Sequence, residues 1–190
     1  MKKVIINSII LLAMSFSLVT AHALSKGEAS ESLEPAISGF ASASRDLDIE
    51  KILDSTYPKV FEIVPREQLS QALTSALKSE AAPKVTGFSV SEDKTVEAFS
   101  GGFYSILSSD TSMVMNGFPD ADTNKQMQSA LEAQGLTVGF DEKNTTFNLS
   151  KKSKIIAINE GQGWKFVDFD QAVNFGQGFL PEEIYAALQK

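Results

Sequence analysis

The hydrophobic pattern of the chain changes once, near Pro83, from a helical period to an alternating one. Before Pro83, apolar residues recur three and four positions apart, which is typical of one buried face of a helix. After it, apolar and polar residues mostly alternate, which is typical of strands with one wet face. Ser32 and Asp170 are the predicted N-caps of two helices. The predicted helices lie at residues 32–44, 48–53, 65–77, 122–135, 170–175 and 181–188, and the predicted strands at 86–90, 95–107, 113–115, 136–141, 145–150, 155–158 and 164–169.

This order of elements predicts an α+β fold, with N-terminal helices packed on a strongly curved antiparallel sheet and a short C-terminal helix, because both layers must bury one apolar face. Gly101-Gly102 interrupts the longest predicted strand and indicates a bulge or a sharp bend. Residues 108–110 are predicted to form a turn. No repeat or linker divides the pattern, so we expect a single domain over residues 32–190, preceded by a flexible lead-in at residues 24–31.

Residues 1–23 have the pattern of a signal peptide: two lysines, an apolar run that ends near Val19, and Ala21-His22-Ala23 as a cleavage site. The run is too short and too polar for a spanning helix, which needs about 20 apolar residues, so we expect no membrane span in the mature chain. A lipoprotein signal would end at a cysteine, and the chain has none. We therefore expect Sec-dependent export from a bacterium, cleavage after Ala21 or Ala23, and a periplasmic or secreted protein.

The composition excludes several kinds of chemistry. The chain has no cysteine and a single histidine, His22, which lies at the predicted cleavage site. Disulfides, cysteine nucleophiles, Ser-His dyads and Cys/His zinc sites are therefore excluded, and we expect no metal and no cofactor. Residues 120–131 begin like a calcium loop but have Lys125 and Leu131 where that loop needs glycine and glutamate. The formal net charge of −7 argues against a nucleic-acid partner.

The order of elements and three segments resemble known proteins. Helices come first, residues 41–48 (ASASRDLD) lead into the second helix, and alternating strands follow. This arrangement resembles the nuclear transport factor 2-like (cone-fold, SnoaL-like) superfamily. Residues 57–65 (YPKVFEIVP) and the Trp164-Lys-Phe ending also resemble exported proteins of Bacteroidetes-type bacteria. The resemblance implies a cone-like fold with an apolar pocket between the helices and the concave face of the sheet.

The resemblance also implies which residue types would function, since enzymes of that superfamily place carboxylates with Tyr, Arg or His in the pocket. Trp164, Phe166 and Asp168 alternate along one strand and should point to one side, and in a dry pocket Asp168 would act as a general acid or base. Tyr104, which follows the glycine pair and Phe103, would donate a hydrogen bond into the pocket. Two simpler interpretations stay open: Asp168 is solvated or helps to cap a helix, and Tyr104 packs its ring with its hydroxyl in water.

We therefore expect an exported, non-enzymatic domain that binds a small apolar ligand or a protein partner, with Trp164, Phe166, Phe103 and Tyr104 lining the ligand pocket. The alternative is a cofactor-free enzyme, similar to an isomerase or a hydrolase, that uses Asp168 and Tyr104 as a carboxylate–tyrosine pair. A homodimer formed through the sheet is a further alternative.

Overall fold

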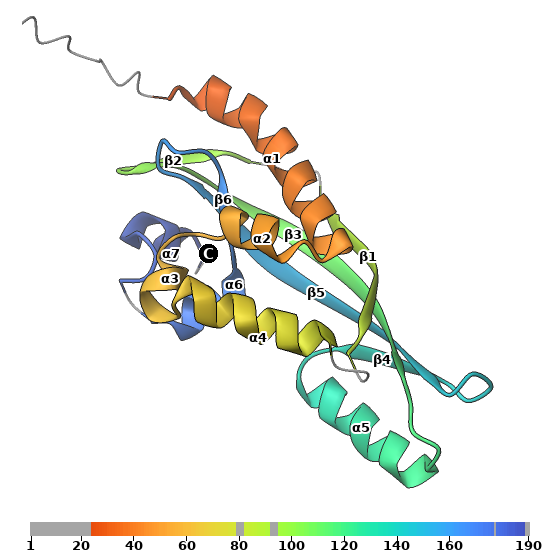
Figure 1. The fold of residues 1–190 in the computed structure, drawn as a ribbon. Helices are drawn as coiled ribbons and strands as arrows, with labels where there is room; N and C mark the ends of the chain where they lie inside the picture. The colour runs from red at the N-terminus through yellow and green to blue at the C-terminus, as the bar shows by residue number, and fades with distance from the viewer. Residues whose placement is uncertain (1–23, 79–81, 92–94, 177, 189–190) are drawn as a thin grey trace, which may run out of the picture.

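The computed structural model describes residues 24–78, 82–91, 95–176 and 178–188, and the predicted leader at residues 1–23 lies outside the described residues. The strands form one antiparallel sheet in the order β1-β3-β5-β4, with β2 paired to β3 and β6 paired to β5 (Figure 1). The strands are β1 (Lys84–Val90), β2 (Glu97–Phe99), β3 (Gly102–Asn116), β4 (Thr137–Asp141), β5 (Thr146–Asn159) and β6 (Lys165–Asp168). The helices are α1 (Lys26–Asp46), α2 (Ile49–Ser55), α3 (Val60–Ile63), α4 (Arg66–Lys78), α5 (Ala121–Ala133), α6 (Phe169–Asn174) and α7 (Glu182–Leu188).

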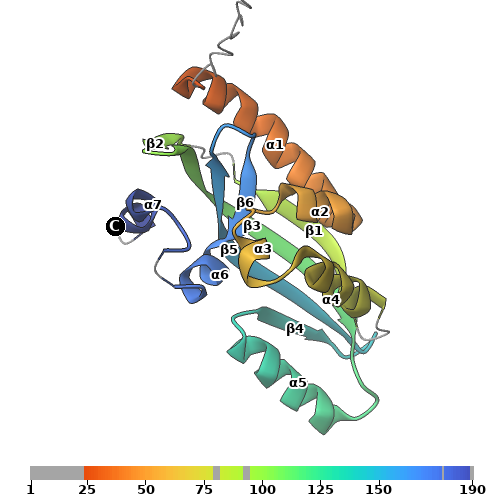
Figure 2. The ribbon, with the colours of Figure 1, turned by 60° about the vertical axis from the view of Figure 1, so that its left-hand side comes forward.

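The sheet is built around β3 and β5, which pair along nearly their whole length and bend and twist together (Figures 1 and 2). Successive side chains of a strand point to opposite faces. We call the inner face the one that carries Ser109 of β3 and its partner Ser153 of β5. The outer face carries Tyr104 of β3 and its partner Ile158 of β5. Because the sheet has these two distinct faces, each predicted site residue can be assigned to one of them.

Helix α1 begins earlier than the hydrophobic pattern predicts. The side chain of Ser25 accepts a hydrogen bond from the backbone N–H of Glu28, and the Glu28 carboxylate accepts one from the Ser25 N–H, which together form a capping box. Residues 26–31, expected to be a flexible lead-in, are therefore helical. Ser32, expected to be the N-cap, lies inside the helix, and its hydroxyl accepts a hydrogen bond from Trp164 Nε1 at 3.1 Å.

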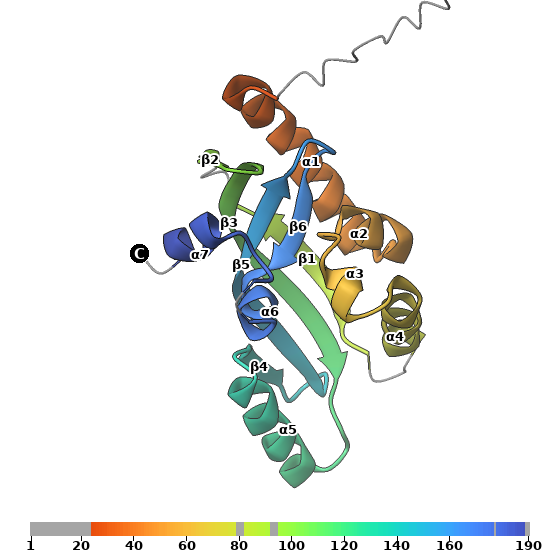
Figure 3. The ribbon, with the colours of Figure 1, turned by 90° about the vertical axis from the view of Figure 1, so that its left-hand side faces the viewer.

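Helices α1, α2 and α4 lie on one side of the sheet, and α6 and α7 lie on the other (Figure 3). The apolar stripe of α1, which includes Leu33 and Ile37, is buried against Trp164 and Phe166. Helix α4 packs on α2 instead of lying down on the strands. Arg66 joins these two helices, since its guanidinium pairs with carboxylates of α2. The inner face is thus closely packed beneath α1, whereas α4 packs mainly on α2 and not on the strands.

The outer face is covered by α6 and α7. Ile184 of α7 is fully buried in the same apolar cluster as Ile156 and Val167 of the sheet. The Tyr185 hydroxyl donates to backbone oxygens of the α6 segment, which ties the two helices together. Helix α5 packs against the far end of the inner face, where Phe147 is fully buried. The described part of the chain thus has three apolar clusters, two on the inner face and one on the outer face.

The predicted α+β class, with N-terminal helices on a curved antiparallel sheet and a short C-terminal helix, is confirmed. Three boundaries differ. The glycine pair is part of a complete chain reversal, because Gly101 lies in the turn and Gly102 of β3 pairs directly with Phe99 of β2. The turn predicted at residues 108–110 is the middle of β3, and the two strands predicted within residues 145–158 are one strand, β5. Among the described residues, no helix is long and apolar enough to cross a bilayer.

Candidate functional site: a cavity beneath helix α4

A space of about 360 Å³ lies between the inner face of the sheet and helices α1, α2 and α4, and we call this space the cavity. Most of the side chains around it are apolar, and they come from every layer that encloses it. Its apolar lining residues are Phe40, Ile52, Leu53, Val60, Leu69, Leu73, Phe88, Ile155, Phe166 and Val167.

Helix α4 forms the roof of the cavity through Leu69 and Leu73, which lie one turn apart. The sequence pattern of this helix is the most regularly amphipathic in the chain, yet no residue of α4 is buried. Leu69 and Leu73 are only half-buried, and Leu77 at the end of the same stripe is 36 % exposed. Leu69 also packs against the edge of the apolar cluster around Ile156 and Val167. The apolar stripe of α4 is therefore only partly packed, and Leu69 and Leu73 also face a space.

Ion pairs connect the N-terminal end of the helix to α2. The Arg66 guanidinium lies 2.9 Å from the Glu50 carboxylate and 2.8 Å from the Asp54 carboxylate, both on α2. Its planar fork suits two carboxylates at once, although exposed pairs of this kind contribute little stability. The pairs thus join the start of α4 to α2 and involve none of its apolar face.

Four polar side chains interrupt the apolar inner face below the roof. Ser109 and Thr111 of β3 lie directly opposite Ser153 and Lys151 of β5, and all four line the cavity. We call these four residues the polar block. The Ser109 Oγ lies 2.8 Å from the Ser153 Oγ and donates to the Ser153 carbonyl oxygen at 3.2 Å, so the two serines satisfy each other. Ser109 is only 3 % exposed, which makes that pairing necessary.

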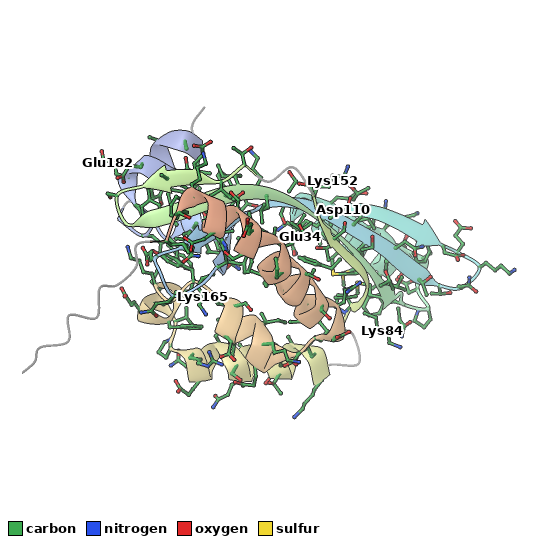
Figure 4. The ribbon with its side chains drawn as sticks, turned by 90° about the horizontal axis from the view of Figure 1, so that it is seen from above. Glu34, Lys84, Asp110, Lys152, Lys165 and Glu182 are labelled. Atoms are coloured by element: carbon green, nitrogen blue, oxygen red, sulfur yellow. The ribbon has the colours of Figure 1, made fainter. Side chains whose placement is uncertain are left out.

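Lys151 is the cation of the polar block. It is half-buried, and within the described part of the chain its ammonium makes no hydrogen bond and no ion pair. Its neighbours on the outer face have other surroundings. Lys152 lies opposite Asp110 (Figure 4), and the Lys154 ammonium lies 5.6 Å from the centre of the Phe169 ring. Of these three lysines, Lys151 is the one that lines the cavity beneath α4.

Asp168 lines the cavity at the end of β6, two residues after Phe166. It is the N-cap of α6, and its Oδ1 accepts a hydrogen bond from the Gln171 N–H at 3.1 Å. The sequence interpretation assigned that cap to Asp170, which instead lies in the first turn of the helix. Asp168 therefore has a structural partner as well as a position at the cavity, and its carboxylate is half-exposed.

The structure separates the other predicted site residues from this cavity. Trp164 is buried nearer α1, where its Nε1 donates to the Ala29 carbonyl oxygen at 3.2 Å and to Ser32. Phe103 packs in the same inner-face cluster as Trp164. Of the four predicted pocket-lining residues, only Phe166 lines the cavity beneath α4.

Tyr104 lies on the outer face, where its ring packs edge-on against Phe99 at 6.3 Å between centroids. Burial, and to a lesser degree the charge of Glu97, raise the pKa of the Tyr104 hydroxyl. It borders a separate, open hollow of about 280 Å³ together with Glu97 and Ala187. Asp168 and Tyr104 therefore border different spaces on opposite faces of the sheet, and the structure does not bring the carboxylate–tyrosine pair together.

The sequence interpretation missed the polar block. Its residues lie in two runs that are polar throughout, residues 108–112 (SSDTS) and 150–154 (SKKSK), so no alternation marks the positions that face inward. Without the register of β3 against β5, these residues look like turns or strand ends. Among the described residues, no group of three carboxylates or histidines is placed to hold a metal ion.

No protein-family model and no curated protein sequence matches this chain. Among solved structures, a protein of Streptomyces avermitilis, described as a "putative dehydratase" from the nuclear transport factor 2-like family, aligns with 75% of this chain and 93% of its own. The sequence identity is 12% and the TM-score is 0.39. At those values the similarity assigns no family, ligand or reaction to this chain.

Proposed function

We propose that the cavity beneath α4 binds a small, mostly apolar molecule, and that the chain is a binding domain. The observation that carries this proposal is the roof: a regularly amphipathic helix with no buried residue, whose leucines face a space of about 360 Å³. Ligand pockets in proteins commonly have volumes of about 300–1,000 Å³, mostly apolar walls and a few polar groups. The cavity has all three properties.

A bound apolar molecule would supply the contacts that α4 lacks. Atoms that line an empty space lose the dispersion contacts that a neighbour would provide. Filling the space beneath Leu69 and Leu73 would restore those contacts and remove apolar surface from water, at about 25 cal/mol per Å² of area. Binding should therefore stabilise the fold, chiefly where α4 meets the rest of the molecule.

The expected location of this function is outside the cytoplasm. It rests on the leader pattern of residues 1–23, with its lysines, apolar run and Ala21-His22-Ala23 ending. A periplasmic or secreted protein with this cavity would act on a molecule that has already crossed, or is about to cross, the cell envelope. Mass analysis of the exported protein for a terminus at residue 22 or 24 tests this part of the proposal.

The binding proposal is tested by filling the cavity from its roof. Leu73→Trp places a larger ring under α4, whereas Leu77→Trp adds the same ring to an exposed position outside the cavity lining. In calorimetric titrations with octan-1-ol, the wild type and Leu77→Trp should bind with similar affinity, and Leu73→Trp should lose about tenfold or more in affinity. Equal affinities for the two variants, or no saturable binding to the wild type, would contradict the proposal.

A further inference from the structure

We infer that the molecule bound beneath α4 is an anionic amphiphile: a small carboxylic acid whose carboxylate contacts Lys151 and whose apolar chain lies under Leu69 and Leu73. This inference rests on the proposed binding function and adds the chemical class of the ligand. It is carried by the position of the polar block, by the unpaired ammonium within it, and by the one carboxylate that shares the cavity.

The polar block is enclosed by apolar residues along both strands. On the inner face of β3, Leu107 precedes Ser109 and Met113 follows Thr111; Leu107 is 1 % exposed and Met113 is partly buried. On β5 the block lies between Leu149 and Ile155, which are both buried. A polar group that served only solubility would lie at an exposed edge of the sheet. Two polar pairs in register, with apolar residues before and after them on the same face, indicate a place built for a polar group of a ligand.

Lys151 gives that place its charge preference. Moving an ammonium partly out of water costs free energy unless a counter-charge or hydrogen-bond acceptor replaces the water. Lys151 is half-buried and has no such partner among the described residues. Its cross-strand neighbour Thr111 has a hydroxyl that also makes no hydrogen bond there. An ammonium and a free hydroxyl side by side are donors that suit a carboxylate, and charge-assisted hydrogen bonds of this kind are the strong ones.

Among the described residues that line the cavity, Asp168 is the one acidic residue, and it does not supply this counter-charge. Its Oδ1 accepts from the Gln171 N–H, and the carboxylate lies at the N-terminus of α6, where a negative charge is stabilised by the helix. The Asp168 carboxylate is thus bonded to the start of α6 and makes no ion pair with Lys151. Lys151 would repel a cationic ligand, and the Asp168 carboxylate that could attract one is already bonded to α6. An anion is therefore the better fit.

The size of the cavity limits the apolar part of the ligand. A volume of about 360 Å³ is near the lower end of the range for ligand pockets, so the chain must be short. Octanoate, octan-1-ol and octylammonium form a matched set for the test, because they share one eight-carbon chain and differ in the charge of the head group. Differences in affinity among them report on the head group alone.

The test compares these three molecules by calorimetric titration against the wild type, Lys151→Met, Lys151→Arg and Lys152→Met. Methionine keeps most of the lysine stem and removes the charge, and arginine keeps the charge. Lys152 is a matched control because it is the next residue in β5, is exposed and lies on the outer face (Figure 4).

We expect octanoate to bind the wild type about tenfold or more tightly than octan-1-ol, equivalent to about 1.4 kcal/mol. Lys151→Met should abolish that preference while octan-1-ol still binds, and Lys151→Arg and Lys152→Met should keep it. The inference is overturned if octanoate binds no more tightly than octan-1-ol, if octylammonium binds most tightly, or if Lys152→Met removes the preference as fully as Lys151→Met. Those results leave the binding proposal standing, whereas failure of all three molecules to bind would overturn both.

Discussion

Replacing Asp168 separates a helix cap from a buried catalytic acid, because the two roles predict opposite changes in stability. The Asp168 Oδ1 accepts from the Gln171 N–H at 3.1 Å, and its backbone has the extended conformation of an N-cap, with φ −65° and ψ 137°. Asp168→Ala removes the acceptor and leaves an N–H of the first turn without its partner. Asp168→Asn keeps an acceptor at the same position and removes the charge.

The expected magnitudes follow from this geometry. Loss of an N-cap acceptor to alanine typically costs about 1 kcal/mol, within a range of about 0.5–2. Asparagine caps nearly as well as aspartate, so Asp168→Asn should lose only the interaction of the charge with the helix end, about 0.5 kcal/mol. For a chain of this size, about 1 kcal/mol corresponds to about 2–4 °C in melting temperature. We therefore expect Asp168→Ala to melt about 3 °C lower and Asp168→Asn to melt within about 1–2 °C of the wild type.

The assay is thermal and urea unfolding of ligand-free protein near pH 8, followed by far-UV circular dichroism. Asp170→Asn is the control, because Asp170 lies in the first turn of the same helix, is exposed and is not the cap. A clear rise in melting temperature for Asp168→Asn would refute the reasoning, since it would mean that the wild type carries a costly buried charge. An unchanged Asp168→Ala would show that the capping bond contributes nothing.

Three further substitutions test separate features of the fold. Burial and the Glu160 carboxylate raise the pKa of Tyr57 above its ordinary value of 10.0, so stability should fall as pH rises through 10, where the unfolded chain ionises first; Tyr57→Phe should flatten this loss in urea titrations across that range. Gly102 has φ +150° and an added Cβ would overlap the Asn159 carbonyl oxygen, so Gly102→Ala should cost about 3 kcal/mol or more by urea unfolding. Ser105 is 1 % exposed and its hydroxyl has no described partner, so Ser105→Ala should be neutral or raise the unfolding free energy by about 1 kcal/mol.

The sequence was most informative where local pattern and tertiary packing agree. The period between residues 65 and 77 predicts a helix, and α4 spans Arg66–Lys78. That period cannot show what the apolar stripe faces, because a packed core and a ligand cavity select the same residues. The function of α4 as a roof follows only from the space beneath Leu69 and Leu73.

The polar block explains the largest error in the strand prediction. Residues 108–110 and 151–154 are polar, and polar runs between apolar segments are typical of turns. Here they continue through the middle of β3 and β5. The Ser109 and Ser153 hydroxyls bond to each other on the inner face, whereas Asp110 and its partner Lys152 lie on the outer face. A polar run is wrongly predicted to be a turn where a sheet carries polar residues in the middle of its strands. The pattern within one strand also cannot show which residues of the next strand lie opposite it.

Strand alternation also decides on which face of the sheet each predicted site residue lies. Strand alternation puts Phe166 and Asp168 at the cavity. It also puts Tyr104 on the opposite face from its neighbour Phe103, which a grouping by sequence proximity overlooks. The leader, the site of cleavage and the exported location stay predictions, since residues 1–23 lie outside the described residues.

Trp164 gives the molecule a built-in optical reporter. It is the only tryptophan in the chain, and its indole is sandwiched between the sheet and α1, with its nitrogen bonded to Ala29 and Ser32 of that helix. Tryptophan fluorescence therefore comes from this one indole and reports on the packing of α1 against the inner face. If that emission and the backbone dichroism change at the same temperature, α1 and the sheet unfold as one cooperative unit. If the emission shifts first, the N-terminal helix leaves the sheet while the strands stay paired.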